Sequence, residues 1–394
     1  MKAPAFTLGV EEEYLVVDRT TRDLVEDLPA TMLTQCKSRI DGQQVKPEFM
    51  RAQIEIGTRI CNSLAEVRDS LTVLRGAVID VADEHGLAPL AVSTHPFAVW
   101  TTQKHSEGAR YHALREEMQA AARRLLICGM HVHVGIEDEE LRIDLMNQFS
   151  YFLPHLLALS CSSPLWEGID TGLKSFRLTV FDGLPRTGIP ERFASFAEFR
   201  RLVRVMTEAG IIQDATKIWW DLRPSARYPT LETRIMDVCT DIDDALCLAA
   251  LVVSVLRMLW RLRCGNQRWR TYSPMLIREN RWRAMRYSFD QGLIDLGRGR
   301  IVPFAQLLDE PLELVREDAE ALGCVHEVEH ARRIVERGTS AHRQLAVRKA
   351  ALDAGASEAE ANIAVVDHLI EETRRGVRPA PAPHAAVAPA GGAG

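Results

Sequence analysis

The chain has 394 residues, 46% of them hydrophobic, and a formal net charge of −6. This length and apolar content are enough for a large core, as one big domain or two intimate ones. No basic stripe with interleaved aromatic residues occurs, which argues against a nucleic-acid partner. The 8 cysteines are scattered without a Cys-x-x-Cys motif, as is typical of buried thiols in a reducing compartment.

The chain also carries no sign of membrane association. The N-terminus lacks a charged leader followed by an apolar stretch, so we expect no signal peptide and a cytoplasmic protein. The most apolar run, Ala245–Trp260, has 16 residues and contains Arg257. It is short for a bilayer span, so the sequence predicts a buried central helix there and no membrane partner.

In chain order, the first half alternates between strand and helix patterns. A Ser-x-x-Glu capping box at Ser63 predicts the start of one amphipathic helix. The predicted elements are a strand, a turn or bulge and a second strand over 5–18, a helix over 63–85, a strand over 87–92, a helix over 107–124, the strand 128–135 and a helix over 140–159.

The second half begins with a stretch rich in Gly, Pro and Thr, 165–190, for which we expect a long ordered loop. The remaining predicted elements are a capped helix over 195–208, strands over 217–223 and 231–237, helices through about 264 and over 305–323, 325–337 and 357–375, and a disordered Pro/Ala/Gly tail over 376–394. Strands concentrated before residue 240 and helices after it indicate an α+β fold.

Acidic and basic side chains recur at alternate positions in four predicted strands, one of which is a further strand over 51–58. Strand residues two apart point to the same face of a sheet. This rule pairs Glu11 with Glu13, Gln53 with Glu55, His131 with His133, and Glu232 with Arg234.

Four such strands indicate a concave sheet whose polar face is a reaction chamber. Carboxylates with at most one or two imidazoles favour Mg²⁺ or Mn²⁺ over structural zinc. Simpler interpretations are an exposed acidic edge, hydrogen-bonded histidines, or a surface ion pair between Glu232 and Arg234 worth about 0–1 kcal/mol. Glu12 lies on the other face, with Val10 and Tyr14, and must find a partner, reach solvent or sit at a bulge.

The order of these motifs resembles that of the carboxylate–amine ligase family, also called glutamate–cysteine ligase type 2. Together the matching segments extend over about residues 5–375. They are Gly9–Glu13, Lys46–Thr58, Cys128–Gly135, Thr171–Arg177, Leu184–Gly188, Ile218–Ser225 and Pro229–Cys239.

The resemblance implies a single ligase catalytic domain over 1–375 with a glutamine-synthetase-like fold, a curved, mostly antiparallel sheet backed by helices. It implies ATP-dependent joining of a carboxylate, such as glutamate, to an amine, such as cysteine, with Mg²⁺ or Mn²⁺. Arg234 matches an arginine that faces the transferred phosphoryl group, and Glu55 and Glu232 are predicted to act with it. The residues that match metal-binding positions are Glu11, Glu13, Glu55, His133 and Glu232.

Other roles are less closely defined. Arg177, Arg186 and Arg223 lie in predicted loops, where they could clamp a substrate carboxylate or serve as structural arginines. No Walker-type phosphate loop occurs, so the nucleotide contacts, the amine acceptor and the oligomeric state, a homo-oligomer included, stay open. The alternative functions are a metal-dependent hydrolase using His131, His133 and a carboxylate, and a non-catalytic binding module.

Overall fold

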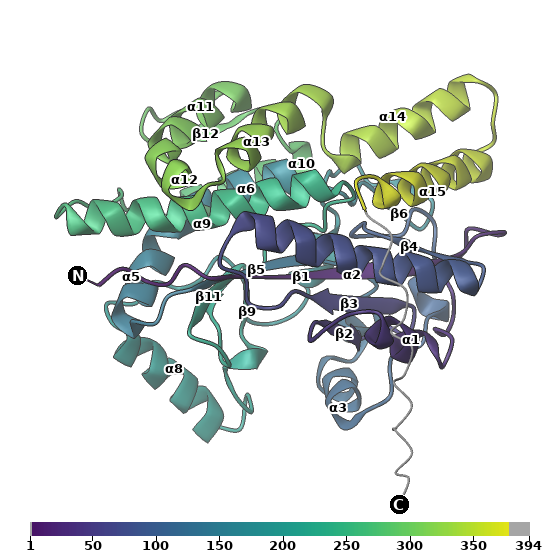
Figure 1. The fold of residues 1–394 in the computed structure, drawn as a ribbon, viewed down its shortest axis with the longest axis horizontal. Coiled ribbons are helices and arrows are strands. Elements are labelled where there is room, and N and C mark those ends of the chain that lie inside the picture. The colour runs from purple at the N-terminus through teal and green to yellow at the C-terminus, as the bar shows by residue number, and fades with distance from the viewer. Residues whose placement is uncertain (1, 378–394) are drawn as a thin grey trace, which may run out of the picture.

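A seven-stranded sheet runs through the centre of the protein (Figure 1). The structure is a computed structural model that describes residues 2–377, so the predicted tail lies outside the described residues from 378 on. The strand order is β10–β11–β5–β1–β3–β2, with β4 also paired to β1, and every pairing is antiparallel. These strands are β1 (Leu8–Asp18), β2 (Gln44–Pro47), β3 (Gln53–Gly57), β4 (Leu87–Leu90), β5 (Met130–Gly135), β10 (Leu222–Pro224) and β11 (Thr230–Thr233).

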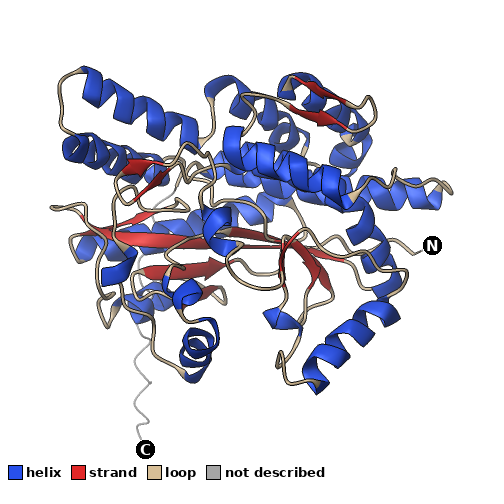
Figure 2. Cartoon of the chain, turned by 180° about the vertical axis from the view of Figure 1, so that it is seen from behind, coloured by secondary structure: helices blue, strands red, loops and turns tan. Residues whose placement is uncertain are grey.

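Two long helices, α2 and α9, lie along one face of this sheet, and α3 and α8 lie on the other side of it (Figure 1). Further helices stack on α9, and Figure 2 shows from behind that helices flank the strands on both sides. The helices are α1 (Met32–Ser38), α2 (Leu64–Glu84), α3 (Ala109–Met118), α4 (Ala120–Arg123), α5 (Glu139–Phe149), α6 (Leu153–Ser160), α7 (Arg177–Phe181), α8 (Phe196–Glu208), α9 (Ile242–Cys264), α10 (Pro274–Tyr287), α11 (Phe304–Leu314), α12 (Arg316–Leu322), α13 (Val325–Arg337), α14 (Ser340–Asp353) and α15 (Glu358–Arg374).

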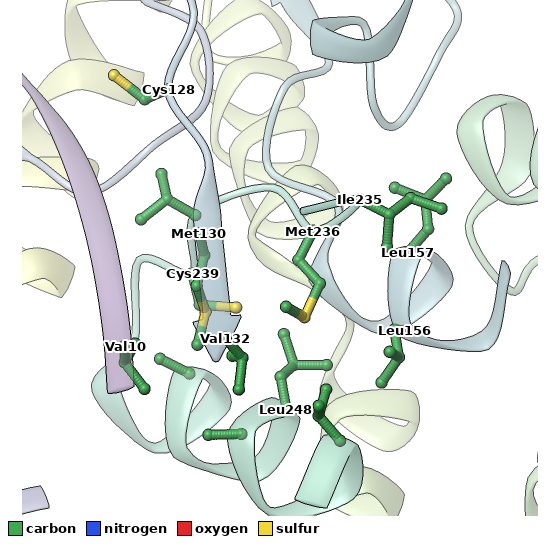
Figure 3. Close-up of a cluster of buried hydrophobic side chains, with 14 of the residues drawn as sticks. Val10, Cys128, Met130, Val132, Leu156, Leu157, Ile235, Met236, Cys239 and Leu248 are labelled. Carbon is green, nitrogen blue, oxygen red and sulfur yellow. The ribbon is translucent and has the colours of Figure 1, made fainter. Parts of the chain in front are cut away.

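The core fills the space between the sheet and α9. Apolar side chains of β1 and β5 pack there against Leu248 of α9 (Figure 3). By length and mean hydropathy α9 could cross a membrane, but 78% of its most apolar window is buried inside the protein. It is therefore the central core helix that the sequence predicts, and seven of the cysteines are also buried, with Cys264 exposed.

Local signals placed several elements correctly. The side chain of Ser63 accepts a hydrogen bond from the backbone of Glu66, and Ser195 caps α8 in the same way. The α+β prediction is confirmed. The segment 165–190 is ordered, and it contains α7 and three short strands, β6 (Leu165–Trp166), β7 (Ile169–Asp170) and β8 (Thr187–Gly188).

Other boundaries differ from the prediction. β1 is one continuous strand, not two strands around a turn. The helix predicted over 107–124 breaks at Gln119, whose φ is 47°. The helix predicted over 140–159 breaks into α5, a 3₁₀ turn and α6, because Pro154 lacks the N–H that a continuous helix needs there.

The C-terminal part is not wholly helical, contrary to the prediction. A hairpin joins β12 (Leu293–Asp295) to β13 (Arg300–Val302). Asp295 Oδ1 accepts hydrogen bonds from the backbone N–H groups of Gly297 and Arg298, which closes the turn. Gly297 and Gly299 lie in this turn, and paired glycines are a local signal for a turn. The remaining short strand, β9 (Trp219–Trp220), pairs in parallel with β8.

Candidate active site

Polar side chains from four neighbouring strands meet on the sheet face opposite α2 and α9. Glu13 of β1 stands directly across from Glu55 of β3. Glu11 stands across from His131 of β5. Further along, His133 stands across from Glu232 of β11. The antiparallel register thus brings together the residues that the sequence placed on one face.

The β1–β3 end of this face carries unbalanced negative charge. Desolvation and the charge of Glu55 raise the pKa of Glu13 to about 7, against the attraction of Arg177. Desolvation and the charge of Glu11 likewise raise the pKa of Glu55, although Lys46 Nζ donates a 3.1 Å hydrogen bond to it. Like charges directly opposite each other in an antiparallel pair are destabilising, so this end favours a cation.

Two histidines border Glu11 in the middle of the face. Glu11 lies 3.2 Å from His131 Nδ1 and 3.8 Å from His133 Nε2. Burial alone would raise the pKa of Glu11, but its hydrogen bonds with both histidines hold that pKa well below its usual range. Burial and the charge of Arg234 lower the pKa of His131 to about 4, so that its ring is neutral at pH 7. A neutral imidazole is the form that binds metals.

The β10–β11 end has the opposite character, because two arginines hold Glu232. Arg223 donates hydrogen bonds of 2.9 and 3.1 Å to its two carboxylate oxygens, and Arg234 also donates to Oε1. Burial would raise the pKa of Glu232, but the charges of Arg234 and Arg223 lower it. Arg234 Nε is buried without a hydrogen-bond partner among residues 2–377. That N–H is available to a ligand.

The three arginines predicted as carboxylate clamps occupy different positions. Arg177 starts α7, so the predicted loop context is wrong for this residue, whereas Arg223 lies in β10, at the end of the strand predicted over 217–223. Arg177 is 3% exposed and lies beneath Glu13 and Arg234, where it donates to the carbonyl oxygens of Ile235 and Arg234 at 3.3 Å. A Cβ on Gly129 would lie 2.3 Å from Arg177 Nη2, which explains the glycine in that motif.

Arg186 does lie in a loop, and it supports a wall of the site. Its guanidinium stacks over the Trp219 ring at 5.2 Å, and its Nε donates a 2.9 Å hydrogen bond to the backbone oxygen of Lys217. Trp219 and Lys217 line a cavity of about 130 Å³ beside Glu13. No pattern in the sequence marks Lys217 for this cavity, because its neighbours are set by tertiary packing.

The donor chemistry at the β1–β3 end fits a hard divalent cation. Glu11, Glu13 and Glu55 supply carboxylate oxygens, the ligands that Mg²⁺ and Mn²⁺ prefer. A cation there would relieve the repulsion that raises the pKa of Glu13. Within residues 2–377, however, no three His, Cys, Asp or Glu side chains are arranged as a metal site, and Glu232 is held by arginines. The residues fit the cation by charge and donor type.

Comparison with known proteins agrees with this geometry. The profile of the glutamate–cysteine ligase family 2 matches residues 7–379. The chain belongs to this family. A glutamate–cysteine ligase 2 of Rhodospirillum rubrum, provisionally so named, is 58% identical over 376 residues, which cover 95% of this chain and 97% of the relative. A relative in Paracoccus denitrificans with the same provisional name is 55% identical over 372 residues, 94% of this chain and 98% of the relative.

Solved structures support the same fold for this glutamate–cysteine ligase family member. The glutamate–cysteine ligase of Francisella tularensis, solved in complex with AMP, superposes with a TM-score of 0.68 at 13% identity, covering 95% of this chain and 90% of that one. A bifunctional glutathione synthetase of Pasteurella multocida gives a TM-score of 0.66 at 14% identity, covering 94% of this chain and 53% of that one. The chain is thus an enzyme of the ligase class with the fold of glutathione-synthesis ligases.

Proposed function

We propose that this enzyme joins glutamate to cysteine, or to another small amine, with ATP and through an acyl phosphate. One observation carries the proposal: a single sheet face bears surplus carboxylates around Glu13 and Glu55 and fixed arginines around Glu232. Membership of the glutamate–cysteine ligase family supports it. The AMP in the solved Francisella tularensis enzyme supports nucleotide use.

The chemistry explains why such a face is needed. A carboxylate is a poor electrophile, because its oxygen leaves badly. Transfer of the γ-phosphoryl group of ATP to the glutamate carboxylate releases ADP and makes phosphate the leaving group. The amine nitrogen then attacks the acyl carbon, the C–O bond to phosphate breaks, and the amine loses a proton. Phosphoryl transfer depends on positioning and charge neutralisation more than on protein nucleophiles.

The β10–β11 end of the face, with its two arginines, positions the anionic groups of the substrates. Glu232 fixes both Arg223 and Arg234, so their guanidinium groups lose little freedom on binding an anion. The buried Nε of Arg234 is the free donor of the pair. We assign Arg234 to the transferred phosphoryl group and Arg177, from beneath the cavity, to the substrate carboxylate.

The β1–β3 end of the face, with its carboxylates, is the predicted cation site. Mg²⁺ or Mn²⁺ bound by Glu11, Glu13 and Glu55, with His133 and Glu232 as the remaining predicted ligands, would neutralise phosphate oxygens. The carboxylates themselves take no proton in this scheme, and His131 orients Glu11 through its 3.2 Å contact.

The direct test is ADP release with glutamate and cysteine together, with each amino acid alone, and with EDTA. We expect release that needs both amino acids and the divalent cation, with one γ-glutamyl amide per ADP by mass spectrometry. Cleavage of an amide or ester substrate without ATP would instead support the metal-dependent hydrolase. The predicted cytoplasmic location and oligomeric state stay predictions.

A further inference from the structure

Lys217 is an enclosed cation at the edge of the active face. It ends the 3₁₀ turn Ala215–Lys217, which Asp214 caps through its side chain. Its side chain is 13% exposed and lines the cavity of about 130 Å³. Glu13, Arg177 and Arg234 line the same cavity, which therefore opens onto the predicted site of chemistry.

The ammonium of Lys217 lacks a hydrogen-bond acceptor among the described residues. Its single ion-pair partner in that part of the chain is Glu117, whose Oε2 lies 3.7 Å from Lys217 Nζ, and its other neighbour is the Trp219 ring at 5.9 Å. Arg234, by contrast, is held by Glu232. The 3.7 Å contact with Glu117 leaves the ammonium free to donate a shorter hydrogen bond, and an entering carboxylate would accept one.

Glu117 lies on α3, and its carboxylate contacts both Lys217 Nζ at 3.7 Å and Arg186 Nη2 at 3.3 Å. Tyr111 of α3 also lines the cavity, and its hydroxyl donates a 3.0 Å hydrogen bond to the oxygen of Pro47. The residues at the two ends of α3, Gly108 and Gln119, both have positive φ, 133° and 47°. Glu117 is therefore presented by a short helix that backbone turns set off from its neighbours.

The cavity lining carries charges of both signs, as a zwitterionic amino acid does. Its acids are Glu13 and Glu48, and its cations are Lys217, Arg177 and Arg234. Phe49, Phe181 and Trp219 supply apolar walls for the carbon skeleton. The ligand that complements this set is an α-amino acid, with its ammonium near the acids and its carboxylate on Lys217.

We propose that Lys217 binds the unreacted carboxylate of an amino-acid substrate and that Glu117 competes with this carboxylate for the lysine. This assignment rests on the ligase function proposed above and adds its binding residue. The carboxylate comes from glutamate or from cysteine, and the Michaelis constants of the two amino acids distinguish these sources.

The test is initial-rate kinetics on three full-length variants. Lys217→Gln should raise KM for one of the two amino acids about tenfold to a hundredfold, as expected for a lost charge-assisted hydrogen bond. It should leave kcat within about threefold and KM for ATP unchanged. Glu117→Gln should lower the same amino-acid KM severalfold, because the competitor loses its charge. Glu116→Gln removes the same charge from an exposed neighbour on α3 and should change nothing.

The double variant tests competition directly. Once Lys217 is replaced, Glu117→Gln should no longer change KM, since the two effects share one interaction. Unchanged amino-acid KM values in Lys217→Gln, or a rise in KM for ATP alone, would overturn the assignment. Calorimetric titration with glutamate and with cysteine separates this proposal from the ligase function. A dissociation constant that rises in Lys217→Gln supports the assignment even if no ATP turnover is found.

Discussion

Glu12 and Glu13 are adjacent acids on β1 that lie on opposite faces of the sheet and differ in their partners. Glu12 is fully buried, and Arg75 of α2 donates hydrogen bonds of 2.9 and 2.7 Å to its two oxygens, while Tyr14 donates a third. Arg75 also donates to backbone oxygens of Cys239 and Thr240 at 2.8 Å. Glu13, on the other face, stands across from Glu55 and keeps a pKa of about 7.

The contrast shows how one strand combines stability with function. The helix-facing acid has a complete set of partners and ties β1 to α2. The site-facing acid has no ion pair within 4 Å among the described residues and a raised pKa, which is typical of a functional site. Substitutions on the two faces should therefore show their effects in different assays, turnover on one face and unfolding on the other.

The largest expected effect is on turnover. Glu13→Gln or Glu55→Gln keeps the side-chain size and removes one negative charge from the predicted cation site. Each should lower kcat by about 10³-fold or more, in line with the loss of preorganised charge in active sites. The metal-free protein should keep its melting temperature or gain a few degrees, because like-charge repulsion is relieved.

Parallel assays of ADP release and thermal unfolding, with and without Mg²⁺, check both halves of this expectation. The matched control is Glu107→Gln, which removes the charge of an acid whose side chain is 81% exposed. Turnover within a few-fold of wild type in both variants would contradict the assigned cation site.

On the opposite face the main effect should be on stability. Arg75→Met keeps much of the apolar stem but leaves Glu12 charged and buried without its cation. Breaking a buried pair in this way should lower the free energy of unfolding by about 3–5 kcal/mol. Urea unfolding of the full chain measures it. A loss below about 1 kcal/mol would show that Glu12 does not depend on Arg75.

The sequence located the active face better than it located the partners of its residues. Strict alternation in four strands is a local signal, so Glu11, His131 and Glu232 could be placed on one face before their register was known. The partnership of Glu12 with Arg75 joins residues 63 apart and depends on how α2 packs on β1.

The same limit explains the remaining differences. The roles of Arg177 and Arg223 depend on tertiary neighbours. The predicted strand 217–223 ends at Arg223, but no local pattern marks Arg177 as the start of a helix. The β12–β13 hairpin was missed because its strands have three residues each, too few for a periodic pattern. The breaks at Gln119 and Pro154 fall inside segments that the sequence predicts as single helices.

A third prediction follows from the raised pKa of Glu13. Its folded pKa of about 7 exceeds its unfolded value, so the folded metal-free protein binds the extra proton between about pH 4.5 and pH 7. The contribution of this carboxyl to the free energy of unfolding is fully present below pH 4.5. It falls by about 3 kcal/mol as the pH rises through 7. The free energy of unfolding, measured against pH across this range, should fall for the wild type and change less for Glu13→Gln. Saturating Mg²⁺ should also flatten it, and identical profiles in all three would contradict the pKa assignment.

The smallest expected effect separates the two histidines that share the active face. His133 matches a metal position and lies 3.8 Å from Glu11, whereas His131 is 6% exposed, lines the cavity and contacts Glu11 and Arg234. His133→Asn should lower kcat/KM for ATP-dependent turnover by roughly tenfold to a hundredfold, the usual loss when support for a metal site is removed. His131→Asn should cost less, because a neutral ring that orients Glu11 is replaced by a side chain that can still donate a hydrogen bond. Equal and severe losses in both variants would favour the hydrolase arrangement, in which the two imidazoles bind one metal.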